Sequence, residues 1–109
     1  MAFDEALAAR IRTRLRGRKG VTEKRMFGGL AFLLNGNLCC AVRGDEMLVR
    51  VDPRDTGRAL REPHTRPFDL PGRPMKGWIL VRPAGLARAA ALGRWVGIGV
   101  KYAGSLPTK

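Results

Sequence analysis

The chain has 109 residues, a length typical of one domain, and 45% of them are hydrophobic, which is enough for an ordinary core. Lys and Arg number 21 against nine Asp and Glu, so the formal net charge is +12. This composition excludes wholesale disorder, and no apolar run approaches the ~20 residues that a membrane-spanning helix needs.

The excess of positive charge has two explanations. A functional basic surface would attract nucleic acid, anionic lipid or acidic proteins through Coulomb steering and counterion release. Alternatively, because Arg is much commoner than Lys and because Ala and Gly are abundant, the charge reflects a GC-rich coding bias and solubility. The folded positions of the arginines distinguish a nucleic-acid role from a protein-interaction role: one contiguous face favours the first, and an even scatter favours the second.

The N-terminal segment predicts an amphipathic helix over residues 3–17. Acidic residues begin it, arginines end it, and Gly17 and Gly20 close it. Its arginines flank both sides of the apolar stripe, which suits cations that extend from a buried face better than a helix that reads a DNA groove. The stripe consists of Phe3, Leu7, Ala8, Ile11 and Leu15.

After this helix the pattern becomes extended. Asn35-Gly36 lies between two apolar runs, which is the strongest short signal for a β-hairpin with a type I′ turn. The expected strands cover residues 21–27, 30–34, 38–42 and 47–51. A short helix over 53–60 and a polar loop over 61–67 are expected to follow.

In the last third, short strands at 68–70 and 75–81 flank a Pro-Gly-Arg-Pro turn at 71–74. A long final helix is expected over 84–104, and Pro107 is expected to end the ordered chain. Gly93, Gly97 and Gly99 each weaken this helix by about 1 kcal/mol relative to Ala. They either allow close approach to the sheet or mark a break.

Together these elements predict a single two-layer α+β domain over residues 1–109, with an antiparallel sheet of five to six strands and the N- and C-terminal helices on one face. The second face of the sheet then carries several apolar side chains. An exposed apolar face is uncommon in monomers, so we expect homodimerisation through it or through a sheet edge. These side chains are Ala31, Leu33, Ala41, Leu48 and one face of the 75–81 strand.

The two cysteines, Cys39 and Cys40, are adjacent in a strand. Neighbouring strand residues point to opposite faces, so we expect two buried free thiols and no disulfide between them. The arginines of the first helix interrupt the first apolar stretch, so no signal peptide is expected and the location is predicted to be cytoplasmic.

The sequence offers little for catalysis or metal binding. One His and two adjacent Cys cannot supply a zinc site, and Ser105, the only serine, lies in a tail expected to fray. A Cys–His pair with His64 is conceivable, but the cysteines lie in an apolar run and His64 lies in a polar loop. Asp52 or Asp55 is expected to cap the short helix. We therefore expect no enzyme activity, no cofactor and no metal.

Nucleic-acid contacts are one interpretation of the basic residues near the N-terminus, and a solvated helix end is the other. Aromatic residues make up only 6% of the chain, and three of them fall in apolar runs, so no base-stacking platform is evident. The candidate contacts are Arg16, Arg18, Lys19, Lys24 and Arg25.

The combination of turn glycines and core aromatics resembles the N-terminal domain of the TfoX/Sxy family. The resemblance covers about residues 3–107. It is carried by Met26, Phe27, Gly28, Gly29, Phe32, Asn35, Gly36, Arg50, Val51, Pro71, Gly72, Arg73, Pro74, Met75, Gly77 and Trp78.

This resemblance implies a two-layer α+β fold in a bacterial intracellular protein. Full-length members regulate natural competence together with the cyclic-AMP receptor protein, but this sequence has no room for their second domain, so a stand-alone N-terminal domain is expected. The predicted function is a non-catalytic regulatory module that contacts a protein, such as a transcription factor, or nucleic acid. The alternative is a protein-interaction or chaperone-like homodimer with no nucleic-acid role. No membrane partner is expected.

Overall fold

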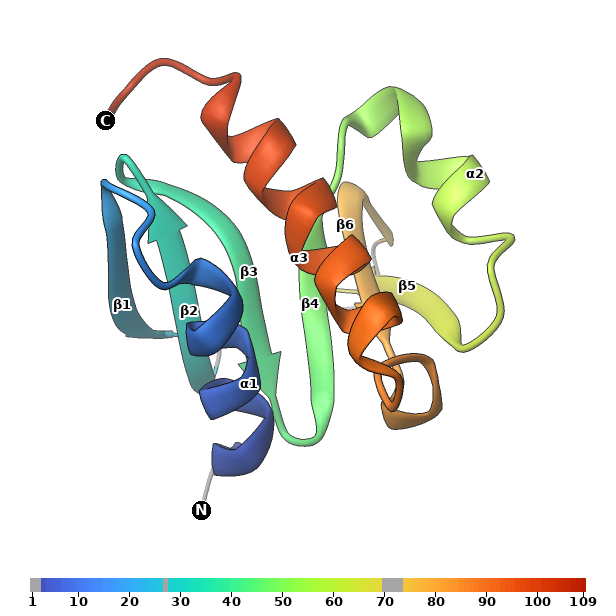
Figure 1. Cartoon of the computed structure of the whole chain (residues 1–109). Helices are drawn as coiled ribbons and strands as arrows, with labels where there is room; N and C mark the ends of the chain where they lie inside the picture. Colours follow the sequence, from blue (N-terminus) through green and yellow to red (C-terminus); the bar gives the residue numbers. More distant parts are fainter. Residues whose placement is uncertain (1–2, 27, 70–73) are drawn as a thin grey trace.

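The computed structural model describes residues 3–26, 28–69 and 74–109. Its elements are, in chain order, α1 (Glu5–Leu15), β1 (Val21–Met26), β2 (Gly29–Leu34), β3 (Asn37–Arg43), β4 (Glu46–Arg50), the 3-10 turn η1 (Pro53–Asp55), α2 (Thr56–Ala59), β5 (Thr65–Asp69), β6 (Pro74–Val81), the 3-10 turn η2 (Pro83–Gly85) and α3 (Ala89–Gly104) (Figure 1).

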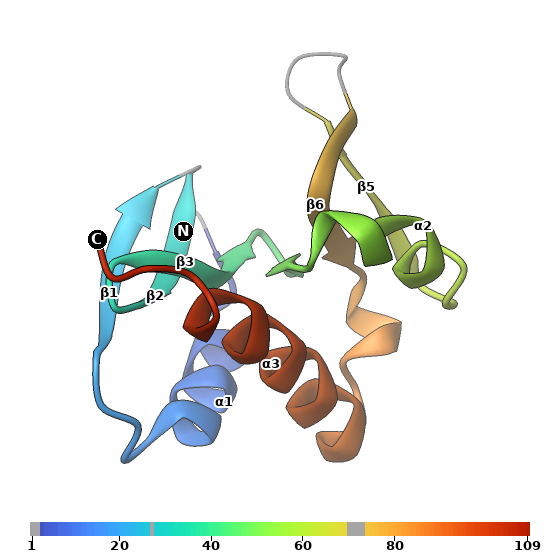
Figure 2. The same ribbon diagram turned by 90° about the horizontal axis from the view of Figure 1, so that it is seen from above.

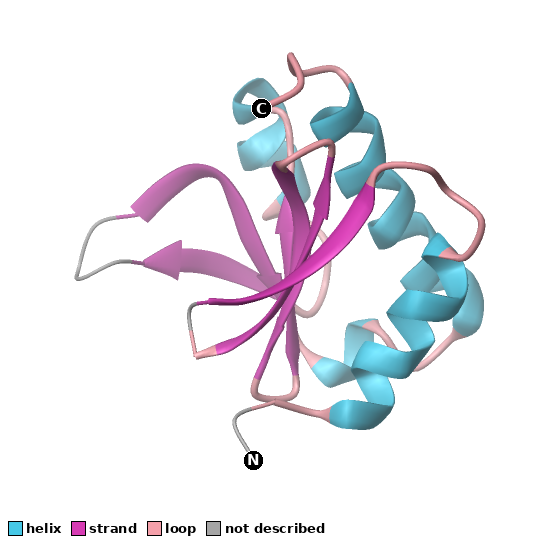
Figure 3. Ribbon diagram, turned by 90° about the vertical axis from the view of Figure 1, so that its left-hand side faces the viewer, coloured by secondary structure: helices cyan, strands magenta, loops and turns pink. Residues whose placement is uncertain are grey.

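The six strands form one antiparallel sheet in the order β1-β2-β3-β4-β6-β5. Helices α1 and α3 cover the same face of this sheet (Figure 3), and α3 packs mainly on β3 and β4. The predicted α+β class is confirmed, as is the placement of the terminal helices on one face. The helix-side core includes Ile11, Phe32 and Val49, each at most 1% exposed.

The second face of the sheet is filled by a small core of its own. Viewed from above, β1–β2 and β5–β6 both rise from the middle of the sheet on the side away from α1 and α3 (Figure 2). This curvature encloses a second cluster formed by Ala31, Leu38, Ala41, Leu48, Phe68 and Leu80. The expectation that Ala31, Ala41 and Leu48 are exposed is therefore wrong, because the curved sheet buries them to 2% exposure or less.

A β-bulge places both cysteines on the helix side of the sheet. Phe32 pairs with Cys40 but Leu33 pairs with Leu38, so Cys39 is an extra residue in β3. Both thiols are free and buried, as predicted, but both belong to the helix-side core. The prediction that they point to opposite faces is wrong because the bulge interrupts the two-residue alternation.

The hairpin between β2 and β3 forms as predicted. Asn35 and Gly36 have φ of 53° and 83°, the positive values that a type I′ turn requires at both central positions. The chain after α3 also contacts this hairpin: Asn37 Nδ2 donates to the carbonyl of Pro107 (2.9 Å), and the N–H of Lys109 donates to Asn35 (3.0 Å). The expected end of order at Pro107, with fraying around Ser105, is thus wrong.

Helix α3 begins at Ala89, five residues later than expected. Residues Pro83–Gly85 form η2, and the carbonyl of Leu86 in the following segment accepts from the Arg10 guanidinium of α1 (2.7 Å). From Ala89 to Gly104 the helix is unbroken. At Gly99 a Cβ would lie 2.5 Å from the carbonyl oxygen of Cys39, so close approach to the sheet, not a break, explains this glycine.

Strand β5 begins at Thr65, within the segment expected to be a loop. Pro67 lacks an N–H and so argues against a central strand, but β5 is at the edge of the sheet, where proline is tolerated. The first helix is also shorter than expected, since Asp4 caps it by accepting from the N–H of Leu7 (3.1 Å). No helix in the described ranges is long and apolar enough to cross a membrane.

Candidate functional site

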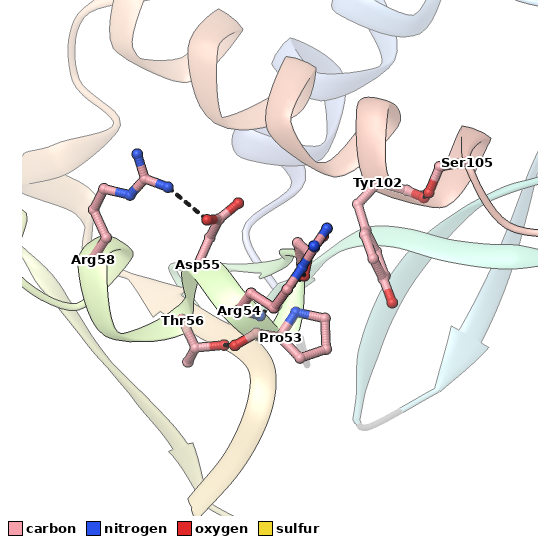
Figure 4. Close-up of polar contacts among 8 residues, drawn as sticks. Pro53, Arg54, Asp55, Thr56, Arg58, Tyr102 and Ser105 are labelled. Atoms are coloured by element: carbon pink, nitrogen blue, oxygen red, sulfur yellow. Dashed lines mark hydrogen bonds and ion pairs between the residues drawn. The ribbon is translucent and has the colours of Figure 1, made fainter.

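A cleft of about 640 Å³ lies between the η1–α2 segment and the C-terminal half of α3, and we call it the α2–α3 cleft. This volume is in the range of sites that bind small molecules or peptide side chains. Figure 4 shows residues of both walls, with Arg54, Asp55 and Arg58 on one side and Tyr102 and Ser105 on the other. Two segments that are far apart in the sequence therefore form the cleft.

The η1–α2 wall is a series of acid–base pairs. Asp52 caps η1, accepting from the Arg54 N–H (2.9 Å), and its carboxylate also binds the Arg54 guanidinium (2.9 Å). This guanidinium hydrogen bond is the main reason why the pKa of Asp52 falls to about 2. Asp55 makes no capping bond and pairs with Arg58 (2.6 Å), so the expected cap is Asp52. The lowered pKa keeps the Asp52 carboxylate ionised near neutral pH.

The α3 wall combines aromatic and polar side chains. Trp95 is 2% exposed, and the Arg94 guanidinium lies over its ring at 4.5 Å while also pairing with Glu62. The Ser105 hydroxyl donates to the carbonyl of Tyr102 (2.6 Å). Trp95 is therefore buried behind this wall, and half-buried Tyr102 is the aromatic side chain that this end of α3 presents to the cleft.

The charges around the cleft cancel. Among its lining residues three are acidic, namely Asp52, Asp55 and Glu62, and three are basic, namely Arg54, Arg58 and Lys101. Val51, Ala59 and Ile98 supply apolar surface between them. A neutral cleft with alternating charges and an apolar base suits a peptide or protein surface better than a phosphate group, which favours concentrated positive charge.

The groups considered for catalysis lie on separate elements. Cys39 is beneath α3 at Gly99, whereas exposed His64 lies beside Gly85 at the start of β5. A hydrogen bond between the two thiols lowers the pKa of Cys39 and raises that of Cys40 well above its ordinary value. Within the described ranges no three His, Cys, Asp or Glu side chains gather as metal ligands would.

The five basic residues predicted to contact nucleic acid do not share one surface. The 16–19 segment, which holds three of them, lies at the C-terminal end of α1. Lys24 and Arg25 are neighbours in β1 and therefore face opposite sides of the sheet. Arg25 lies over the ring of Phe3 (5.6 Å), at the other end of α1.

Most other arginines contact groups within the chain and are distributed over it. Their partners are carboxylates, aromatic rings or backbone carbonyls. The carboxylate pairs involve Arg12, Arg54, Arg58, Arg66 and Arg94; the ring contacts involve Arg25, Arg43, Arg50 and Arg94; Arg10 and Arg14 donate to carbonyls of the segment that leads into α3. This is a scatter, not one contiguous basic face.

Thr56 joins the cleft wall to the sheet. Its buried hydroxyl donates to the carbonyl of Pro53 (2.9 Å) and accepts from the N–H of Gly77 (2.7 Å). Gly77 has φ of +87°, and a Cβ there would lie 3.2 Å from the carbonyl oxygen of Val51. The position of the η1–α2 wall thus depends on Gly77, a residue of β6 with a positive φ angle.

We expect Thr56→Val to lower the free energy of unfolding by about 2 kcal/mol, because the buried Gly77 N–H loses its acceptor. Urea unfolding followed by tryptophan fluorescence measures this change. Thr56→Ser keeps the hydroxyl group, so its free energy of unfolding should fall by clearly less. Equal losses for the two variants would show that the methyl group contributes as much as the hydrogen bond, and unchanged stability of Thr56→Val would contradict the role of the hydrogen bond.

The residues that carry the family resemblance have structural roles. Gly28 has φ of +72°, and a Cβ on Gly29 would lie 1.9 Å from the carbonyl oxygen of Val42. Met26 packs against the second core, and the ring of Trp78 lies 5.1 Å from the guanidinium of Arg50. Phe27, Gly72 and Arg73 lie outside the described residues. Val51 is the residue of the family resemblance that also lines the cleft.

Comparison with known proteins agrees with the sequence resemblance. The family model of the TfoX N-terminal domain matches residues 13–103, which is nearly the whole chain. No curated protein and no solved structure gives a significant match. The chain therefore belongs to the TfoX N-terminal domain family.

Proposed function

We propose that this chain is a non-catalytic regulatory binding module of the cytoplasm, and that it contacts a protein partner, such as a transcription factor, through the α2–α3 cleft. Membership of the TfoX N-terminal domain family supports a regulatory role related to transcription or competence. The partner supplies any catalytic or DNA-reading function of the complex.

The scatter of the arginines is the observation that carries this proposal. A nucleic-acid interface needs cations that converge on one surface and neutralise a row of phosphates. Here the cations are distributed over α1, β1, β3, β4, η1, α2, β5 and α3, and many contact carboxylates or rings of the chain itself. The neutral, partly apolar cleft is closer in character to a protein interface.

The homodimer alternative has less support than the sequence suggested. Its motivation was an exposed apolar sheet face, and the curved sheet buries the centre of that face. Leu33, Met75 and Trp78 remain partly exposed at its rim. Sedimentation at tens of micromolar tests this alternative, and a stable dimer would revive it.

Titration of labelled duplex DNA and single-stranded RNA across a salt series tests the choice of partner class. We expect weak binding without sequence preference that disappears between about 50 and 200 mM salt, because only net charge drives it. Sequence-selective binding that persists at the upper salt concentration would contradict the proposal and favour a nucleic-acid module.

Site-specific crosslinking tests the cleft. A photoreactive residue in place of Ser105, at the rim of the cleft, should give one reproducible protein adduct in living cells. The same residue in place of His64, which is exposed and outside the cleft, serves as the control. Adducts of equal yield at both positions would contradict a specific cleft partner.

A further inference from the structure

A second groove, on the opposite flank of α3, differs from the cleft in charge. It has a volume of about 500 Å³ and lies between α1 and α3, and we call it the α1–α3 groove. Three exposed cations border it: Arg14 from α1, Arg18 from the following loop and Lys101 from α3. No carboxylate is among its described lining residues, so cations from three separate segments border one groove, and one of them, Lys101, also lines the α2–α3 cleft.

Apolar side chains and glycines form the rest of the groove. Leu15, Leu34 and Val96 lie beneath the groove and are each at most 5% exposed, so Val100 of α3, which is partly buried, is the apolar side chain of the base that a ligand can reach. A ligand that buries apolar surface there and presents negative charge to the rim would match both features. A bare phosphate backbone would meet the cations but would leave Val100 and the exposed helix surface at Gly97 uncovered.

Gly97 is the residue whose presence the internal packing does not explain. Glycine weakens a helix interior, yet a Cβ at Gly97 would meet nothing within 4 Å. The other two glycines in the groove lie against neighbouring side chains. A Cβ at Gly93 would lie 2.6 Å from the Arg14 guanidinium, and a Cβ at Gly104 would lie 3.5 Å from Leu34. An exposed glycine in the wall of a groove lets a ligand backbone approach the helix closely.

We propose that the α1–α3 groove binds an acidic amphipathic helix of a partner protein, with its apolar stripe on the groove base and its carboxylates at Arg14, Arg18 and Lys101. This inference rests on the proposed protein-binding function and deepens it by giving the partner a second contact of stated chemistry. Binding of an amphipathic helix in a groove is a recurrent mode of peptide recognition, and the glycine side of α3 gives such a helix room.

The test uses a synthetic helical peptide of 18 residues with a leucine stripe flanked by glutamates, and a second peptide in which every glutamate is glutamine. Chemical-shift mapping of the isotope-labelled full chain should place the acidic peptide on α1 and α3, with at least tenfold weaker binding of the glutamine peptide. Arg18→Glu should weaken the acidic peptide at least tenfold, whereas Arg16→Glu, a neighbouring cation that does not line the groove, should have a much smaller effect.

Gly97→Leu separates binding from folding. A Cβ at this position meets nothing within 4 Å and Leu favours a helix more than Gly does, so the variant should fold and resist urea at least as well as the parent, yet lose peptide binding. Gly57→Leu is the matched control, because Gly57 is helical, has equal open space and lies outside both sites. Unchanged binding to the Gly97→Leu variant would overturn the proposal.

Other occupants give distinguishable results. Tighter binding of duplex DNA or of anionic lipid vesicles at the groove, or no groove shifts with millimolar acidic peptide, overturns the acidic-helix inference. Shifts confined to the α2–α3 cleft also overturn it but leave the protein-binding function standing. Groove binding without a Ser105 crosslink would instead contradict only the cleft as the principal contact.

Discussion

Gly99→Ala is expected to lower the free energy of unfolding by about 3 kcal/mol, because its methyl group would lie 2.5 Å from the carbonyl oxygen of Cys39. The obstructing atom belongs to the backbone of a central strand, so it cannot rotate away. Helix α3 must therefore move from the sheet and disturb the packing of Trp95 and Val96, which are buried on the same helix. Urea unfolding monitored by circular dichroism measures the loss.

Gly97→Ala, two residues earlier in the same helix, is the control for Gly99→Ala. It has no neighbour to strike and should raise the free energy of unfolding by roughly 0.5–1 kcal/mol, the usual gain of Ala over Gly in a helix. Opposite signs for the two variants would identify the contact with β3 as the cause. A gain for both would mean that α3 does not approach Cys39 this closely.

Gly29→Ala is expected to lower the free energy of unfolding at least as much as Gly99→Ala, by about 3 kcal/mol or more. Its Cβ would lie 1.9 Å from the carbonyl oxygen of Val42 in the adjacent strand. Small domains have only about 5–15 kcal/mol of total stability. The variant should therefore show a much lower unfolding midpoint or fail to accumulate as folded protein, and heteronuclear NMR of the soluble fraction would reveal which.

For this substitution the matched comparison is Gly57→Ala, at a glycine with ordinary φ and no neighbour within 4 Å. It should be neutral or stabilising. Near-parental stability of Gly29→Ala would imply that β2 and β3 separate locally at this end, contrary to the pairing of Leu30 with Val42.

The local elements with strong chemical signals were predictable. Asn35-Gly36 required a tight hairpin, and the apolar stripe from Leu7 to Leu15 required a helix on the sheet. The alternation of Met47, Val49 and Val51 placed one side of β4 in the helix-side core. In each case a single segment contains all the information, because backbone preference and burial agree.

The missed features depend on contacts between distant segments. No residue near Cys39 in the sequence indicates a β-bulge. A regular alternation of side chains was therefore assumed along the whole strand. The segment before α3 accepts a hydrogen bond from Arg10 of α1, and the burial of the second sheet face follows from curvature that brings Phe68 over it. Pro67 was a misleading signal because an edge strand tolerates it.

The two surface sites were also hidden from sequence reasoning. Each combines α3 with a segment at least thirty residues away, and neither contains a recognisable motif. A partial signal existed in the Asp52-Pro53 helix start and in the aromatic residues of α3. The predicted basic residues contributed one member, Arg18, to the α1–α3 groove.

The bulge in β3 places both thiols beneath α3, the helix that the α2–α3 cleft and the α1–α3 groove share. With both thiols buried in the core that α3 covers, a thiol reagent reaches them only when the helix separates from the strand, and a bulky adduct on Cys39 would then prevent its return. Helix α3 forms one wall of the cleft and one wall of the groove. Covalent modification at this point would therefore disrupt the walls of the cleft and of the groove at once, and its rate would report how often the folded protein opens there.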